Sequence, residues 1–133
     1  MAAKAAIWSE GRLLCVREGE RSDSPYDLPG GRLEAGEPIQ HGLRREVREE
    51  LGVEIASASE LPIQTWSATT PEGVGVVALL YSVILASHAF VFSEGDEVTG
   101  ARYLTLEELE RLPGGIHKPH ALAYFREGRA RPR

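Results

Sequence analysis

The stretch "GRLEAGEPIQHGLRREVREELGV", Gly31 to Val53, holds a short predicted helix between two turn signals. Pro38 fits the first turn of a helix, and Gly52 fits the position just beyond the last turn. At about 100° per residue, one face of this helix is apolar. The residues on that face are Ile39, Leu43, Val47 and Leu51. The pattern predicts an amphipathic helix that packs on a core.

Three acidic residues crowd the last turns of this helix. Glu46 and Glu50 border the apolar face, and Glu49 lies farther round. Like charges four residues apart repel, and negative charge is unfavourable near a helix C-terminus. Arg45 can pair with Glu49, but the remaining carboxylates need a cation, and converging hard oxygen ligands suit Mg²⁺ or Mn²⁺. From the helix alone, a solvated acidic helix without a metal is the open alternative.

The loop before the helix favours the metal. Gly30 and Gly31 let the backbone come close to a metal or a phosphate, and a glycine carbonyl can itself be a ligand. Glu37 lies at the helix start, where it can accept from N–H groups or reach the metal. The simpler interpretation of Glu37 is a helix-start carboxylate only.

Composition limits the class of protein. The chain has 133 residues and a formal net charge of -5, so we expect one domain over residues 1–133 and no nucleic-acid surface. Cys15 is the only cysteine, so it forms no internal disulfide, and we expect it to be a buried core residue. No apolar run is long enough for a signal peptide or a membrane span, which predicts a cytoplasmic protein.

The rest of the chain alternates strands and helices. Residues 26–37 read as a loop because they contain Pro29 and several glycines. Helices are expected at 105–112, with Thr105 and Glu108 as a capping box, and at 119–128. The mixture predicts an α/β fold with helices on both sides of a mixed sheet. Strands are expected at residues 3–8, 12–17, 53–56, 63–68, 74–86 and 97–104.

Residues Gly31 to Val53 resemble the signature of the Nudix hydrolases, G-x5-E-x7-R-E-U-x-E-E-x-G-U, and every fixed position matches. The flanking "YDLPGG" and "ARYLTLEELERLP" also look like small MutT-like members. This resemblance implies an α/β/α sandwich around a mixed sheet. It also implies metal-dependent hydrolysis of a nucleoside diphosphate linked to another group, X.

The resemblance assigns roles to individual residues. It implies that Glu49 and Glu50 are metal ligands and that Glu46 is either a ligand or the base that activates water. It implies that Arg45 orients Glu49 and that the Gly30 carbonyl is a further ligand. The Gly30–Gly31 loop would face the phosphates.

Other site residues lie outside this stretch. From "SEGDEV" we choose Glu97, ahead of Glu94 and Asp96, as an additional acidic ligand or base; a solvated turn is the alternative. Arg17 resembles an arginine that touches phosphate in some members. For the base pocket we expect Leu28, His117 and Lys118, while aromatic residues in strands are more often core. Those aromatic residues are Tyr26, Trp66 and Tyr81.

The sequence leaves the substrate open. A chain this short fits a (d)NTP pyrophosphohydrolase, which we favour. An ADP-ribose or nucleotide-sugar pyrophosphatase is the alternative, and Pro71 lies close to, but not at, the place where ADP-ribose enzymes tend to carry a proline. A non-hydrolytic nucleotide sensor and an RNA 5′-end hydrolase are less favoured. We expect a nucleotide substrate, no membrane or nucleic-acid partner, and a monomer or homodimer.

Overall fold

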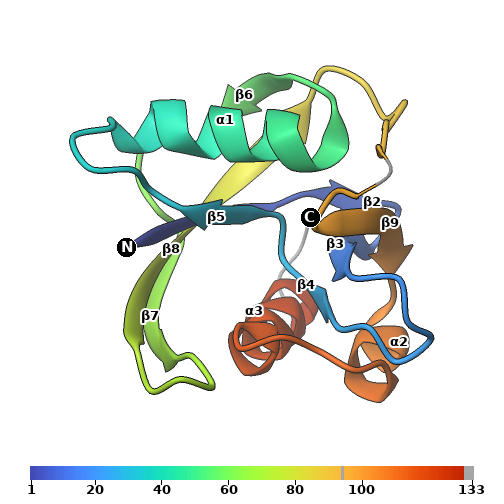
Figure 1. Cartoon of the computed structure of the whole chain (residues 1–133). Helices are drawn as coiled ribbons and strands as arrows, with labels where there is room; N and C mark the ends of the chain where they lie inside the picture. Colours follow the sequence, from blue (N-terminus) through green and yellow to red (C-terminus); the bar gives the residue numbers. More distant parts are fainter. Residues whose placement is uncertain (94, 131–133) are drawn as a thin grey trace.

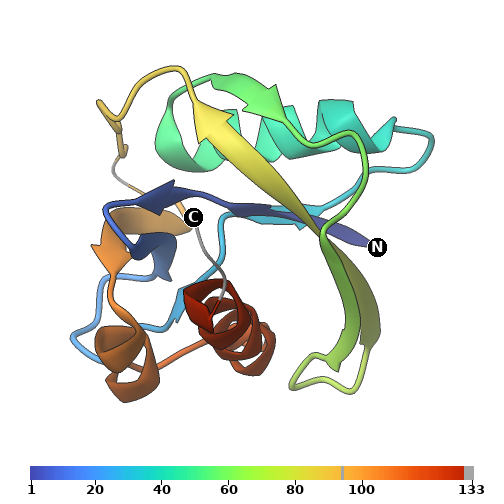
Figure 2. The ribbon, with the colours of Figure 1, turned by 180° about the vertical axis from the view of Figure 1, so that it is seen from behind.

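A computed structural model of the chain describes residues 1–93 and 95–130 (Figure 1). Two sheets form the centre of the molecule. Helix α1 covers one side, and α2 and α3 lie on the opposite side (Figures 1 and 2). The expected α/β arrangement, with helices on both sides of a mixed sheet, is confirmed.

The larger sheet has five strands in the order β5-β1-β8-β6, and β7 also pairs with β8. Strands β1 and β8 run parallel, and the other pairs are antiparallel, so the sheet is mixed. Strand β8, which contains the mostly apolar run "VVALLYSVIL", pairs with β1, β6 and β7. The strands are β1 (Ala2–Ala6), β5 (Gly30–Arg32), β6 (Ile55–Ala58), β7 (Gln64–Thr69) and β8 (Gly75–Leu85).

The smaller sheet is built around β3, which pairs with β2, β4 and β9. Residues Glu10 and Gly11 have φ of 51° and 74°, and they form the tight turn between β2 and β3. The first predicted strand is split, however: β1 pairs in the larger sheet, and only β2 forms the hairpin with β3. The strands are β2 (Trp8–Ser9), β3 (Arg12–Glu18), β4 (Tyr26–Asp27) and β9 (Val98–Leu104).

Three helices complete the fold: α1 (Ile39–Leu51), α2 (Leu106–Arg111) and α3 (Lys118–Ala130). Pro38 lies just before α1 rather than inside it, and Gly52 ends α1 in the left-handed conformation with φ of 70°. The predicted capping box at Thr105 and Glu108 is present at the start of α2. The predicted bounds therefore hold within a few residues.

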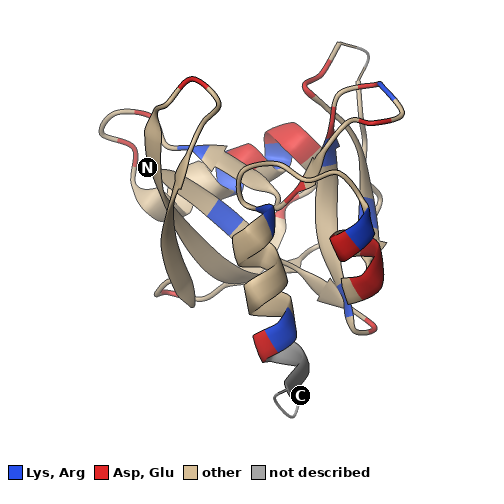
Figure 3. Ribbon diagram, turned by 90° about the horizontal axis from the view of Figure 1, so that it is seen from below, with Lys and Arg blue, Asp and Glu red and all other residues tan. Residues whose placement is uncertain are grey.

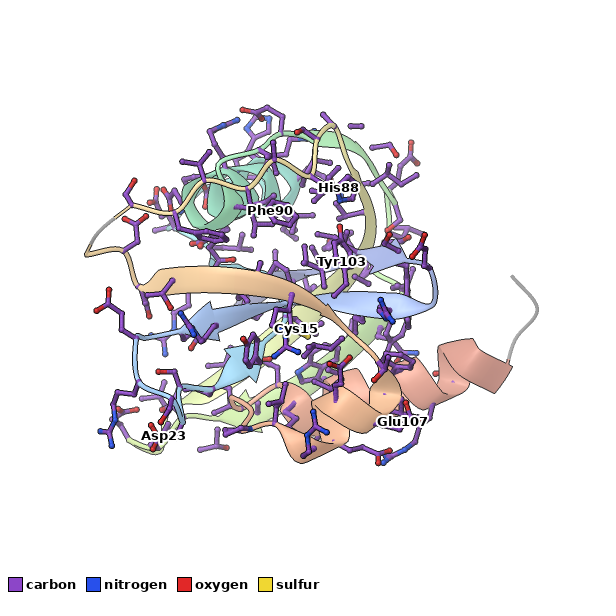
Figure 4. All side chains as sticks on the ribbon, turned by 90° about the vertical axis from the view of Figure 1, so that its right-hand side faces the viewer. Cys15, Asp23, His88, Phe90, Tyr103 and Glu107 are labelled. Atoms are coloured by element: carbon purple, nitrogen blue, oxygen red, sulfur yellow. The ribbon has the colours of Figure 1, made fainter. Side chains whose placement is uncertain are left out.

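The buried face of α1 packs on the first of two core clusters. Leu43, Val47 and Leu51 are fully buried there, as the helical spacing predicts. Phe90 and Tyr103 pack against the same cluster, next to His88 (Figure 4). The second cluster lies under α2 and α3.

Cys15 lies in β3 inside the second cluster (Figure 4) and is fully buried, as expected for a core residue. Burial raises the pKa of its thiol to about 12, so the thiolate is not accessible near neutral pH. Among the described residues, no helix is both long and apolar enough to cross a bilayer. The cytoplasmic location stays a prediction.

Residues 26–37 are not wholly a loop, which corrects the sequence interpretation. Strand β4 pairs with β3, and β5 pairs with β1 through Ala3 and Lys4 opposite Gly31 and Gly30. Glycine and proline disfavour strands locally, but here the strand partners come from distant parts of the chain. These two short strands fix the loop that leads into α1.

Candidate active site

A cavity of about 920 Å³ lies between the acidic side of α1 and the loop before α3. Glu18, Glu46 and Glu50 line it from the side of α1 and β3. His117 and the tip of the β7–β8 hairpin line its other parts. Acidic and basic segments alternate along α1 (Figure 3), and Glu18, Asp27 and Glu97 from other elements add negative charge to the cavity.

Arg45 organises the carboxylates of α1. Its Nε lies 2.7 Å from Glu37 Oε2, and its Nη1 lies 3.0 Å from Glu46 Oε1 and 3.2 Å from Glu49 Oε2. The predicted pair with Glu49 is therefore present. Glu37 does not accept from the N–H groups of α1: it accepts from Arg45 and from Glu34 N–H, and Arg45 lowers its pKa to about 2.

Glu46 and Glu50 line the cavity, while the Glu49 side chain is 59% exposed and lies outside the lining. Burial raises the pKa of Glu46, against the opposing effect of Arg45. Burial also raises the pKa of Glu50 to about 8, although Gly30 N–H donates to Glu50 Oε1 at 2.7 Å. The charge of the Glu50 carboxylate is thus only partly compensated within the protein, by Lys4 and by the Gly30 N–H.

Gly30 and Gly31, at the start of β5, fit closely between β1 and α1. Gly30 has φ of 118°, and a Cβ there would lie 2.1 Å from the Ala3 carbonyl oxygen. A Cβ at Gly31 would lie 2.6 Å from Glu46 Oε2. Gly30 therefore requires glycine, whereas a Cβ at Gly31 would displace the end of the Glu46 side chain, beside which Gly31 lines the cavity.

Glu97 also lines the cavity, close to Glu18: burial raises the pKa of Glu18, and the negative charge of Glu97 adds to this rise. Its location is consistent with a further acid at this end of the site. Asp96 instead accepts from Ser93 N–H within a turn. Glu94, the third acid considered, lies outside the described residues.

Two predicted contacts are not supported by the geometry. Arg17 Nε donates to Thr99 Oγ1 at 3.1 Å, and the side chain is not part of the cavity lining. Leu28 is fully buried in the second core cluster, where it cannot touch a ligand. It directly follows Asp27, which lines the cavity, and neighbouring residues of extended chain point to opposite faces.

The two residues predicted at the start of α3, His117 and Lys118, lie in different places: one lines the cavity and the other does not. His117 lines the cavity, and its Nδ1 accepts from Trp66 Nε1 at 3.0 Å. Because an indole N–H can only donate, the neutral imidazole carries its proton on Nε2. Burial lowers the pKa of His117 to about 4. Lys118 instead donates to the carbonyls of Glu110 and Leu112 at the end of α2, outside the cavity lining.

Two buried charged residues that line the cavity, Lys4 and Asp27, were not predicted from the sequence. Nor was the loop at 112–115, whose "LPGG" repeats the "LPGG" at 28–31. Tyr26 bridges to Gly114, and a Cβ at Gly115 would lie 2.2 Å from Asp27 Oδ2. The repeated glycines, and a lysine inside the apolar stretch "AAKAA", were the available signals.

The raised pKa of Glu50 predicts how stability depends on pH when divalent ions are chelated. The unfolded chain loses this proton near the ordinary value of 4.5, but the folded chain keeps it up to about 8. Stability should therefore fall between these pH values, by at most about 5 kcal/mol at about 1.4 kcal/mol per unit. Urea titrations across this range measure the effect. The Glu50→Gln variant should not show this fall in stability. If its stability depended on pH as steeply as that of the parent, Glu50 would not be the group responsible.

The donor set suits a hard divalent cation. Glu46, Glu49 and Glu50 offer carboxylate oxygens, and Gly30, whose N–H donates to Glu50, offers a carbonyl oxygen that accepts from Lys4 Nζ. Within the described residues, no three His, Cys, Asp or Glu side chains converge closely enough to hold an ion as they stand. Arg45 contacts two of the acids, so their carboxylates would have to exchange that contact, at least in part, for the ion.

The family model described as NUDIX domain matches residues 1–125. The chain belongs to the Nudix hydrolase family. Nudix hydrolases generally need a divalent metal ion. The nucleoside triphosphatase NudI of Enterobacter sp. (strain 638) is 30% identical over 110 residues, which cover 75% of this Nudix chain and 77% of NudI.

Other similar proteins are more distant in length or sequence. The NAD-capped RNA hydrolase NudC of Pseudomonas aeruginosa (strain LESB58) is 33% identical over 119 residues, 79% of this chain but 39% of NudC. A MutT Nudix hydrolase from Burkholderia pseudomallei has a TM-score of 0.76 at 24% identity, covering 92% of this chain and 94% of that one. The Nudix domain of Shewanella oneidensis NrtR, complexed with ADP ribose, has a TM-score of 0.72 at 15% identity, covering 97% and 87%. The two structural matches share the fold of this chain.

Proposed function

We propose that this Nudix hydrolase is a Mg²⁺- or Mn²⁺-dependent pyrophosphohydrolase of (deoxy)nucleoside triphosphates. The observation that carries the proposal is one cavity that joins the carboxylates of α1 to His117. Phosphates fit the end with metal-ligand chemistry, and a base fits the end with directional hydrogen-bonding groups. The likeness to a nucleoside triphosphatase over most of both chains supports this choice.

Each residue of the site has a role in this proposal. Glu46, Glu49, Glu50 and the Gly30 carbonyl would hold the ion, which supplies charge neutralisation and lowers the pKa of a bound water. Glu46 is a candidate base because burial raises its pKa towards neutrality. Arg45 would hold the carboxylates in position through its contacts with both Glu46 and Glu49.

A pyrophosphatase of ADP-ribose or a nucleotide sugar is the second candidate. Pro71, at the tip of the β7–β8 hairpin, lines the cavity together with Thr70 and Glu72. In this alternative, a second sugar of the substrate would lie against the tip of this hairpin. The acidic net charge disfavours RNA, and the retained acids of α1 disfavour a non-hydrolytic sensor.

A product screen tests the proposal. NTPs, dNTPs, oxidised dNTPs, ADP-ribose, nucleotide sugars and dinucleoside polyphosphates are incubated with and without Mg²⁺. We expect a nucleoside triphosphate to give the highest kcat/KM, with nucleoside monophosphate and pyrophosphate as products. Label from ¹⁸O-water should enter a phosphate product, because water attacks phosphorus. Preference for ADP-ribose, or label on a sugar hydroxyl, would contradict the proposal.

Divalent ions should also stabilise the protein. An ion that binds only the folded chain adds about 2.7 kcal/mol at a hundredfold excess over its Kd. We expect Mg²⁺ to raise Tm by several degrees in calorimetry, and the double replacement of Glu46 and Glu50 by Gln to abolish this rise. Glu54→Gln, which changes an exposed acid outside the cavity, is the control. An equal rise in the double variant would place the ion elsewhere.

A further inference from the structure

Lys4 is a buried lysine that lines the cavity. It lies in β1 with alanines on both sides, and only 5% of its surface is exposed. It shares the cavity lining with Glu46, Glu50 and His117. Lysine is almost never this buried without a partner for its charge. The hydrogen-bond partners of its ammonium group therefore show whether its charge is compensated within the protein.

Those partners are neutral. Lys4 Nζ donates to the carbonyl oxygens of Leu28 and Gly30, each at 3.1 Å. An ammonium has three N–H donors, so one remains after these two bonds. Among residues 1–93 and 95–130, the structure shows no carboxylate within 4.0 Å of Nζ and no third acceptor.

A buried charge without an opposite charge is costly. The cavity lining brings this charge together with Glu46 and Glu50 of α1 and with His117 at the other end of the cavity. The ammonium of Lys4 acts electrostatically on all three of these groups. An anion that spans the cavity would pass this ammonium.

We propose that the free N–H of Lys4 binds a non-bridging phosphate oxygen of the substrate, between the metal-binding acids and the nucleoside. The proposal rests on the proposed function only in that a polyphosphate occupies this cavity. It applies equally to the triphosphate of an NTP and to the diphosphate of ADP-ribose. Lys4 would then add positive charge to a cavity that is otherwise mostly acidic, where a polyanion needs it.

Two variants separate charge from packing. Lys4→Met keeps the aliphatic stem, and Lys4→Gln also keeps N–H donors for the carbonyls of Leu28 and Gly30. The probe is an α,β-methylene nucleoside triphosphate with Mg²⁺, measured by calorimetry. Loss of a charge-assisted hydrogen bond should raise its Kd about tenfold to a hundredfold in both variants. Arg126→Met, which removes an exposed charge paired with Glu110 away from the cavity, should bind like the parent.

The unphosphorylated nucleoside is the second probe. A purely structural role for Lys4 would weaken nucleoside and triphosphate alike. The proposal requires the nucleoside Kd to stay unchanged while the Kd for the triphosphate rises. Equal weakening of both, or an unchanged Kd for the triphosphate, would overturn it.

The unmodified protein gives a measurement that does not depend on whether the variants fold. With lysines labelled with ¹³C and ¹⁵N, the Lys4 Cε–Nζ NMR signals should shift when the triphosphate analogue binds, and not with nucleoside. Unmoved Lys4 signals at saturation would also overturn the proposal. Failure of the proposed function would instead appear as the parent enzyme preferring another substrate in the screen, with the Lys4 shift retained for that substrate.

Discussion

Replacing Glu50 by Gln should lower kcat by about a hundredfold or more, at saturating Mg²⁺ and nucleotide, because metal activation supplies several kcal/mol of transition-state stabilisation. Gln keeps the shape of the side chain but removes the negative charge that would hold the ion. Glu50 is the half-buried acid of α1 that lines the cavity and accepts from Gly30 N–H. Steady-state kinetics with pyrophosphate release measure the change.

The expected loss of kcat in Glu50→Gln should not result from unfolding of the variant. Burial raises the pKa of Glu50 to about 8, so the neutral Gln replaces a carboxyl that is mostly protonated at pH 7 when divalent ions are chelated. Tm in chelator should therefore stay the same or rise. Glu54→Gln, on the exposed pair with Arg48, is the matched control and should retain the parent kcat. Near-parent turnover in Glu50→Gln would refute the assignment of the metal site to α1.

The second large effect is on stability. Gly30→Ala should destabilise the protein by about 3–5 kcal/mol, enough to unfold much of it, because two unfavourable terms combine. The φ of 118° is rarely adopted by residues with a side chain, and the added Cβ would lie 2.1 Å from the Ala3 carbonyl oxygen. That oxygen belongs to the backbone of β1, which cannot move without breaking the larger sheet. Urea unfolding followed by circular dichroism measures the loss.

Gly75→Ala is the matched control for this loss. Gly75 begins β8 and lies outside the left-handed region, and a Cβ added there would meet no atom within 4 Å. The substitution should change the free energy of unfolding by less than about 1 kcal/mol. If Gly30→Ala unfolded at the same urea concentration as this control, the close contact between β5 and β1 would be wrong.

Local patterns were enough for α1 and its acids. The four-residue spacing of Leu43, Val47 and Leu51 fixes the buried face of a helix, and the acids then follow at set angles. Turn residues were equally informative: Gly52 ends α1 with positive φ, and Glu10–Gly11 turns the chain into β3. Each of these features depends on neighbours within a few residues, so the sequence alone determines it.

The two short strands β4 and β5 could not be predicted in this way. Their residues resist strand formation, and only pairing with β3 and β1 makes them strands. The same pairing places Lys4 opposite Gly30, so a lysine from the first strand reaches the loop before α1. Side-chain direction also depends on this packing, which is why Leu28 lies in the core rather than in the cavity.

The sequence by itself therefore determined the family, the acidic helix and the chemistry of its donors. The tertiary structure decided which charged groups share the cavity: Glu46, Glu50 and His117 meet Lys4 and Asp27 there, while Lys118 and Arg17 do not line it. The physical reason is the distance along the chain over which each effect acts. Helical periodicity and turn chemistry act over a few residues, whereas burial, and the pKa changes that burial causes, depend on contacts between strands far apart in the chain.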